Sequence, residues 1–169
     1  MNSEINQDSK LEYFLAEADA TEALGRQLAS CLPDGAVLWL RGELGAGKST
    51  VARAMLRALG VTGAIKSPTY TLIEQYPVEG GDALHLDLYR IADAAELDFL
   101  GLADLASQAR CWLIEWPERG GKFLPQADLG LLLEVSTGGR RVNLAAHSQK
   151  GRVWLADLSK IAASGASVQ

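Results

Sequence analysis

The sequence predicts an α/β fold: a three-layer sandwich in which a mostly parallel central sheet has helices on both faces, with an antiparallel meander at the C-terminal end. Three observations predict it. The apolar run of residues 36–40 (AVLWL) is typical of a short buried strand and leads through a glycine-rich loop into a helical pattern. The run of residues 111–115 (CWLIE) ends in one acid, as expected of a central parallel strand. From residue 129 short strand patterns flank a glycine turn, which indicates antiparallel pairing.

Length, charge and cysteine content limit the class of protein. The 169 residues fit one domain, which we place at residues 11–158, with disordered tails at residues 1–10 and 159–169. A formal net charge of −5 argues against a broad grip on the phosphate backbone of nucleic acid. We find no secretion signal and no apolar run near the ~20 residues that span a membrane. Cys31 and Cys111 stand in apolar contexts and are expected to be reduced, so the chain is expected to be cytoplasmic.

The first expected element is a helix that ends at the turn of residues 33–35. Asp19 and Glu22, three positions apart, can form a capping box at its start. Its apolar face consists of residues four positions apart: Ala20, Leu24, Leu28 and Leu32. After the strand of residues 36–40 and the glycine-rich loop, a second helical pattern continues until Gly60.

Two strand patterns follow, at residues 70–76 and 83–89. In the second of them leucines alternate with polar and aromatic residues, so Asp87 is expected to face away from the leucine side. Asp93 and Glu96 then form a possible capping box at the start of another helix.

A second short helix is expected over residues 102–109, before the strand that ends at Glu115. The C-terminal meander is then built from three strands around a turn at residues 137–139. Its strands are expected at residues 129–135, 142–146 and 153–158.

The glycine-rich loop carries the strongest functional signal. Residues 42–49 (GELGAGKS) fit the P-loop pattern G-x-x-x-x-G-K-[ST] at every fixed position. Its glycines allow a tight turn without intruding side chains, so that backbone N–H groups can surround a polyphosphate. The next helix directs its N-terminal dipole at the same anion, Lys48 can reach the outer phosphates, and Ser49 can place its hydroxyl on Mg²⁺. The sequence therefore predicts a site for a nucleoside triphosphate with Mg²⁺.

Two acids are candidates for the rest of this site. Glu115 ends a buried strand and can hold Mg²⁺ or its waters. Asp87 can orient an attacking water or bind the metal through water, although a plain surface aspartate fits the same pattern. Trp116 can pack over the nucleotide, or it can belong to the core.

Other polar residues carry weaker signals. Thr69 and Thr71 can contact the γ-phosphate or the metal, but threonines beside a proline are also common in turns. His85 and His147 have no partners at metal-ligand spacing, so we interpret both as structural or exposed.

Four segments of the chain together form a recognisable pattern. They are residues 42–50 (GELGAGKST), 66–72 (KSPTYTL), 85–90 (HLDLYR) and 114–117 (IEWP). In this order they resemble the TsaE (YjeE) family, the small bacterial ATPases required for threonylcarbamoyladenosine modification of tRNA. The resemblance covers about residues 21–158. It implies an ATP- and Mg²⁺-dependent hydrolase that is weak alone and stimulated by two partner proteins, TsaD and TsaB.

The resemblance also implies a division of labour. The TsaB–TsaD complex transfers threonylcarbamoyl to tRNAs that read codons beginning with A, and the ATPase resets that complex between turnovers. The chain itself would be a monomer when alone and would meet tRNA only through its partners.

Roles for single residues follow from the same resemblance. Lys48, Asp87 and Glu115 are the expected catalytic residues, and Ser49, Asp87 and Glu115 the expected metal ligands. The expected ATP contacts comprise the P-loop, a switch-like loop, a tryptophan and three weak matches near adenine. They are Gly42, Leu44, Gly45, Ala46, Gly47, Lys48, Ser49, Thr50, Thr69, Trp116, Ala18, Glu118 and Gly139.

Two other functions remain open from the sequence. A small-molecule kinase of this size usually carries an arginine-bearing lid, and residues 119–122 match one poorly. A nucleotide-gated binding protein would need ATP binding and not hydrolysis. A GTPase is disfavoured because no N-K-x-D segment occurs in the chain.

Overall fold

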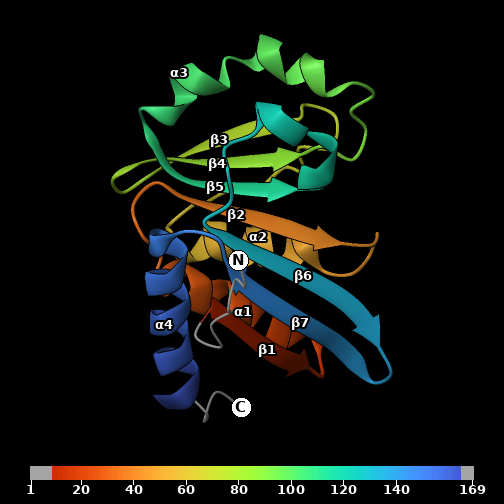
Figure 1. The fold of residues 1–169 in the computed structure, drawn as a ribbon, viewed down its shortest axis with the longest axis vertical. Helices are drawn as coiled ribbons and strands as arrows, with labels where there is room; N and C mark the ends of the chain where they lie inside the picture. The colour runs from red at the N-terminus through yellow and green to blue at the C-terminus, as the bar shows by residue number, and fades with distance from the viewer. Residues whose placement is uncertain (1–8, 165–169) are drawn as a thin grey trace, which may run out of the picture.

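The centre of the fold is a parallel sheet. In the computed structural model, which describes residues 9–164, the strands form one seven-stranded sheet in the order β1-β7-β6-β2-β5-β4-β3 (Figure 1). β2 (Ala36–Gly42) lies in the middle and pairs in parallel with β5 (Ala109–Glu115) and β6 (Leu129–Ser136). β4 (Gly81–Asp87) continues the parallel part beside β5. This confirms the α/β fold with a mostly parallel central sheet.

Antiparallel strands form both edges of the sheet. β3 (Ile73–Val78) pairs with β4 at one edge. At the other edge β7 (Gly139–Ala146) pairs with β6, and β1 (Lys10–Leu15) pairs with β7. β1 shows a period of two, with buried Leu15 on one face and exposed Phe14 on the other. The first strand of the chain therefore completes an edge built by its last two strands.

Three helices cover one face of the sheet. They are α1 (Ala18–Ser30), α2 (Lys48–Ala58) and α4 (Gln149–Ser164), and their leucine, methionine and tryptophan side chains share one apolar core with the inner residues of β2, β5, β6 and β7. α1 and α2 lie very close together at Gly25. A Cβ at that position would stand 2.6 Å from the Cβ of Ala54, so only glycine permits this approach.

Shorter helices cover the other face over β4 and β5. They are η2 (Ala94–Leu100), α3 (Leu102–Ala106), η3 (Pro117–Arg119) and η4 (Gly121–Phe123). A second apolar core joins Leu97 and Leu102 to the leucines of β4 and to Ile114. The sheet thus has helices on both faces, as predicted. No helix within residues 9–164 combines the length and apolar character that crossing a membrane requires.

The predicted strand at residues 153–158 is wrong, because this segment belongs to α4. Leu155 and Leu158 follow Trp154 by one and four positions, so a helix places all three on a single buried face. The hydroxyl of Ser148 accepts a hydrogen bond from the N–H of Gly151 (2.9 Å) and so caps the start of this helix. The third strand of the antiparallel group is instead β1, which pairs with β7.

The predicted tails are also partly wrong. Lys10 is the first residue of β1, and residues 159–164 form the end of α4. The buried face of α4 continues through Leu158, which keeps this part of the chain helical. The other residues of the predicted tails, except Ser9, lie outside the described part of the chain.

Of the two capping boxes predicted from the sequence, one is confirmed and one is wrong. The capping box of Asp93 and Glu96 is confirmed, and it opens the 3₁₀ helix η2. The capping box of Asp19 and Glu22 is wrong, because α1 begins at Ala18, two residues earlier than a helix capped by Asp19 would. Its cap residue is Glu17, whose side chain makes no capping bond. The chain enters α1 directly from β1, and this connection fixes the start of the helix.

Candidate functional site

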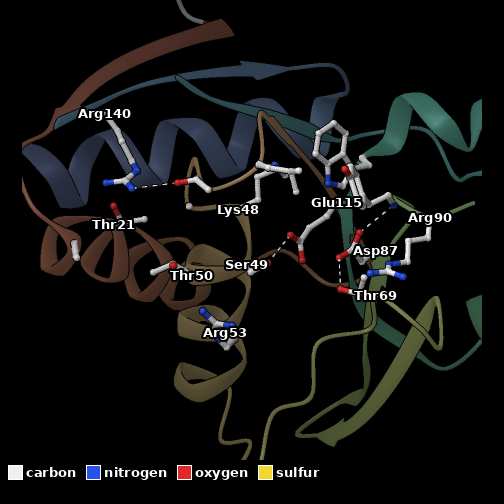
Figure 2. Close-up of a pocket in the computed structure, with 16 residues that line it drawn as sticks. Thr21, Lys48, Ser49, Thr50, Arg53, Thr69, Asp87, Arg90, Glu115 and Arg140 are labelled. Carbon is white, nitrogen blue, oxygen red and sulfur yellow. Dashed lines mark hydrogen bonds between the residues drawn. The ribbon is translucent and has the colours of Figure 1, made fainter. Parts of the chain in front are cut away.

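A cavity of about 460 Å³ opens where the parallel strands end (Figure 2). The carboxyl ends of β4 and β5 contribute Asp87 and Glu115, and the start of α2 contributes Lys48 and Ser49. Figure 2 shows these four side chains in the middle of the cavity, with Arg140 at one end. Ligands of open parallel sheets bind at this edge, so the position alone marks a candidate site.

The glycine-rich loop forms the floor of the cavity between β2 and α2. Gly42 has a φ of 145°, and a Cβ there would stand 2.5 Å from the carbonyl oxygen of Leu133. Gly47 has a φ of 115° and stands directly before α2. Because side chains rarely adopt these conformations, both positions require glycine. The loop therefore turns directly into the N-terminus of α2, whose free N–H groups and dipole attract an anion.

Lys48 is buried beneath this loop. Its ammonium donates hydrogen bonds to the carbonyl oxygens of Gly42 and of Glu43 (2.8 Å), and lies 4.3 Å from the centre of the Trp116 ring. Burial lowers the pKa of Lys48, and nearby carboxylates, first that of Glu115, oppose this effect. One cation is thus held inside the cavity by neutral oxygens and an aromatic face.

Trp116 forms a wall of the cavity in an unusual conformation. Its φ of 56° is uncommon for a residue with a side chain. Its ring lies 5.0 Å from that of Tyr89, between ring centres. Strained conformations of this kind cluster at functional sites, so the local strain supports the assignment of this cavity.

The two acids are neighbours on one face of the sheet. Asp87 and Glu115 are directly paired in the register of β4 and β5. Glu115 accepts a hydrogen bond from the hydroxyl of Ser49 at Oε1 (2.8 Å), and its Oε2 lies 2.6 Å from Nε2 of His85. Asp87 accepts hydrogen bonds from the Thr69 hydroxyl (3.1 Å) and from the backbone N–H of Tyr89 (3.0 Å). Both carboxylates are therefore held in fixed orientations.

This set of oxygen atoms fits Mg²⁺. The cation prefers oxygen ligands and usually takes one or two carboxylates with phosphate and water oxygens. The hydroxyl of Ser49 and the carboxylates of Glu115 and Asp87 supply oxygens of these kinds beside the phosphate loop. In the described part of the chain no group of three or more His, Cys, Asp or Glu side chains could hold a metal ion. A cation here would depend on a phosphate as well as on the protein.

Most of the site residues predicted from the sequence line this one cavity. They are Ala18, Leu44, Gly45, Gly47, Lys48, Ser49, Thr50, Thr69, Asp87, Glu115 and Trp116.

Four predicted residues lie outside the lining. Gly42 and Ala46 belong to the loop but do not line the cavity: the carbonyl of Gly42 holds Lys48, and that of Ala46 accepts a bond from Arg140. The charge of Glu118 helps, after Glu115 and Asp87, to oppose the lowering of the Lys48 pKa. Gly139 packs against the end of β1, where a Cβ would collide with the carbonyl of Leu15.

Sequence reasoning missed several lining residues, among them Thr21, Arg53, Tyr89, Arg90 and Arg140. The guanidinium of Arg140 donates hydrogen bonds to the carbonyl oxygens of Ala46 and Gly45, across more than ninety positions of sequence. No local pattern could have revealed that contact. A signal existed only for Tyr89 and Arg90, which follow Asp87 by two and three positions.

His85, for which the sequence indicates either a structural or an exposed residue, is buried, with 1% of its surface exposed. The alternation of β4 did contain a signal. Residues 85 and 87 share one face of the strand, so His85 had to lie on the same face as Asp87.

Comparisons with known proteins agree on one family. A family model described as "Threonylcarbamoyl adenosine biosynthesis protein TsaE" matches residues 15–142. The tRNA threonylcarbamoyladenosine biosynthesis protein TsaE of Haemophilus influenzae is 42% identical over 116 residues, which cover 69% of this chain and 73% of that protein. The protein of the same name from Synechocystis sp. is 38% identical over 123 residues, with 70% and 75% covered.

A solved structure has the same fold. The crystal structure of Bacillus subtilis YdiB superposes with a TM-score of 0.76 at 26% sequence identity, and covers 89% of this chain and 95% of that one. With the P-loop, the two paired acids and these relatives together, the chain belongs to the TsaE family of threonylcarbamoyl adenosine biosynthesis proteins.

Proposed function

We propose that this chain is an ATP hydrolase that serves a TsaB–TsaD complex in the formation of threonylcarbamoyladenosine in tRNAs reading codons that begin with A. ATP binding and hydrolysis would reset that complex between turnovers. One observation carries the proposal: the phosphate loop, Lys48, the Ser49–Glu115 pair and Asp87 converge in a single cavity. Family membership and the names of the relatives support the link to tRNA modification.

Each residue has a distinct part in the proposed hydrolysis. The N–H groups of the loop and of the first turn of α2 bind the phosphates, and Lys48 exchanges its loop carbonyls for phosphate oxygens. Ser49 and Glu115 would hold Mg²⁺, which would supply positive charge to neutralise the phosphates. Asp87, fixed by Thr69 and by the N–H of Tyr89, accepts a proton of the attacking water and orients it.

The net charge of −5 supports an indirect relation to tRNA, because direct binding to a phosphate backbone needs a basic surface. We therefore propose that the chain meets tRNA only through its two partners. From its membership of the TsaE family we propose further that it is a monomer when alone and works in the cytoplasm.

The decisive experiment measures ATP hydrolysis by the purified chain alone and with TsaB and TsaD. We expect weak hydrolysis alone and stimulation by the partners together. Lys48→Ala should lose ATP binding, and Glu115→Ala should retain nucleotide binding in EDTA while losing Mg²⁺-dependent hydrolysis. Unchanged threonylcarbamoyladenosine in tRNA after depletion of the chain would refute the proposed role.

The same two variants test whether hydrolysis itself is needed. If Glu115→Ala still supports normal tRNA modification while Lys48→Ala does not, ATP binding alone controls the partners. The chain would then be a nucleotide-gated binding protein and not a working hydrolase.

A further inference from the structure

His85 is a buried polar residue that the proposed reaction does not yet use. It lies on β4 two positions before Asp87, on the same face of the sheet as Asp87 and Glu115. The parallel register places His85 opposite Leu113 and Asp87 opposite Glu115, so His85 reaches Glu115 along the diagonal. Both side chains of the pair have 2% of their surface exposed.

The contact between them is short and specific. Nε2 of His85 lies 2.6 Å from Oε2 of Glu115, while Nδ1 has no hydrogen-bond partner among the described residues. A carboxylate oxygen can only accept a hydrogen bond, so Nε2 is the donor in this contact. The only polar partner of this ring in the described chain is thus the acid of the proposed cation site.

The other oxygen of Glu115 has a different task. Oε1 accepts the hydroxyl hydrogen of Ser49 at 2.8 Å and faces the cavity. The last torsion of a glutamate side chain is soft, so a carboxylate held by one oxygen only can turn. With His85 on Oε2, the remaining freedom is removed and Oε1 stays on the side of Ser49.

We propose that His85 is a positioning residue that fixes the Glu115 carboxylate through Oε2 and thereby prepares the Ser49–Glu115 pair to hold Mg²⁺ with the bound nucleotide. The proposal rests on the proposed function, since it assigns His85 to the cation half of that site. Partners that orient a metal-binding side chain commonly change metal affinity by about 10- to 100-fold when removed.

The test compares three substitutions of the same buried position. His85→Gln places an amide N–H near the position of Nε2 and keeps the donor. His85→Asn keeps the same chemistry but its amide is too short to reach Glu115. His85→Leu keeps apolar bulk and removes every polar atom. The control is His147→Gln, at an exposed histidine that does not line the cavity.

The measurement is calorimetric binding of a non-hydrolysable ATP analogue, in EDTA and over a series of MgCl₂ concentrations. We expect His85→Asn and His85→Leu to raise the Mg²⁺ concentration for half-saturation by about 10- to 100-fold, with binding in EDTA unchanged. His85→Gln and His147→Gln should reach half-saturation at the same Mg²⁺ concentration as the unsubstituted protein. If His85 served only to pack, the glutamine and asparagine variants would not differ in the Mg²⁺ concentration that they require.

The outcomes separate the two proposals. If the unchanged protein does not bind the analogue with Mg²⁺, the proposed function fails. If the unsubstituted protein binds the analogue and all three His85 variants need the same Mg²⁺ concentration as it does, only the positioning role is refuted. Thermal unfolding identifies a misfolded variant, and should His85→Leu not fold, the glutamine and asparagine variants decide the question. An equal Mg²⁺ requirement for these two would overturn the role.

Discussion

Single residues of the site differ in how visible they are in the sequence. Lys48 and Ser49 could be predicted because the phosphate loop is a local motif, and Glu115 because it ends a buried strand. Arg140 could not be predicted, since it depends on the register between β7 and its neighbours, which no short segment encodes. Residues within a local motif could therefore be predicted from the sequence, whereas contacts between distant segments became visible only in the structure.

Arg140→Ala tests one of these distant contacts. Its guanidinium donates to the carbonyls of Ala46 and Gly45 (3.2 Å to the latter) and so holds the phosphate loop. We expect about fivefold to tenfold weaker ATP binding, equivalent to ~1 kcal/mol, because the loop loses its support. Arg141→Ala is the matched control: that side chain is 55% exposed and pairs with Glu12. Equal affinities for the two variants, by calorimetry, would contradict the role of Arg140.

Gly42→Ala tests the need for glycine in the loop. Its φ of 145° and the carbonyl of Leu133, 2.5 Å from a built Cβ, both oppose a side chain. We expect a loss of unfolding free energy of about 1–3 kcal/mol, measured by chemical denaturation. Gly60→Ala has a similar positive φ of 100° but nothing within 4 Å of its Cβ, so it isolates the conformational part. A smaller loss for Gly42→Ala than for Gly60→Ala would contradict the expected collision.

Among the elements, the parallel strands were predictable and α4 was not. Residues 36–40 and 111–115 are apolar runs that only a buried strand explains in this context. Residues 153–158 are a short apolar run that fits a strand or a buried helix equally well. The difference lies in Trp154, whose indole N–H donates to the carbonyl of Leu28 in α1 at 3.1 Å. Tertiary packing decided this element.

Ser148→Ala tests what starts α4. The Ser148 hydroxyl accepts from the N–H of Gly151 and donates to a carboxylate oxygen of Asp128 at 2.6 Å. We expect a loss of about 1 kcal/mol in unfolding free energy, as for other helix caps. Ser164→Ala, at the other end of the same helix, removes only an exposed bond to Ile161 and should change little. Denaturant midpoints that do not separate these two variants would refute the cap.

At the scale of the whole molecule, folding buries the thiol of Cys111 and partly buries that of Cys31. Burial raises the pKa of Cys111 from 9.0 to about 12, and burial followed by the charge of Asp157 raises that of Cys31 to about 11. Because the charged form is disfavoured inside, both cysteines are expected to stay protonated and unreactive in the folded chain at neutral pH.

This predicts a loss of stability in alkaline solution. Above pH 9.0 the unfolded chain releases its thiol protons while the folded chain retains them, up to about pH 11 for Cys31 and about pH 12 for Cys111. The unfolded state then binds fewer protons, so the unfolding free energy falls as pH rises, by ~1 kcal/mol per pH unit for the more buried thiol. Denaturation of the unchanged chain and of a Cys31→Ala, Cys111→Ala variant over this range measures it. Identical pH slopes would show that the thiols have no part.

The close approach of α1 and α2 at Gly25 has a mechanical consequence for the cavity. α1 carries Ala18 and Thr21 on one wall, and α2 carries Lys48 and Ser49 on the floor. Because the missing side chain of Gly25 lets α1 lie this close to α2, the spacing between wall and floor depends on that one position. A side chain there would have to displace one of the two helices, and with it the wall or the floor that would receive a nucleotide.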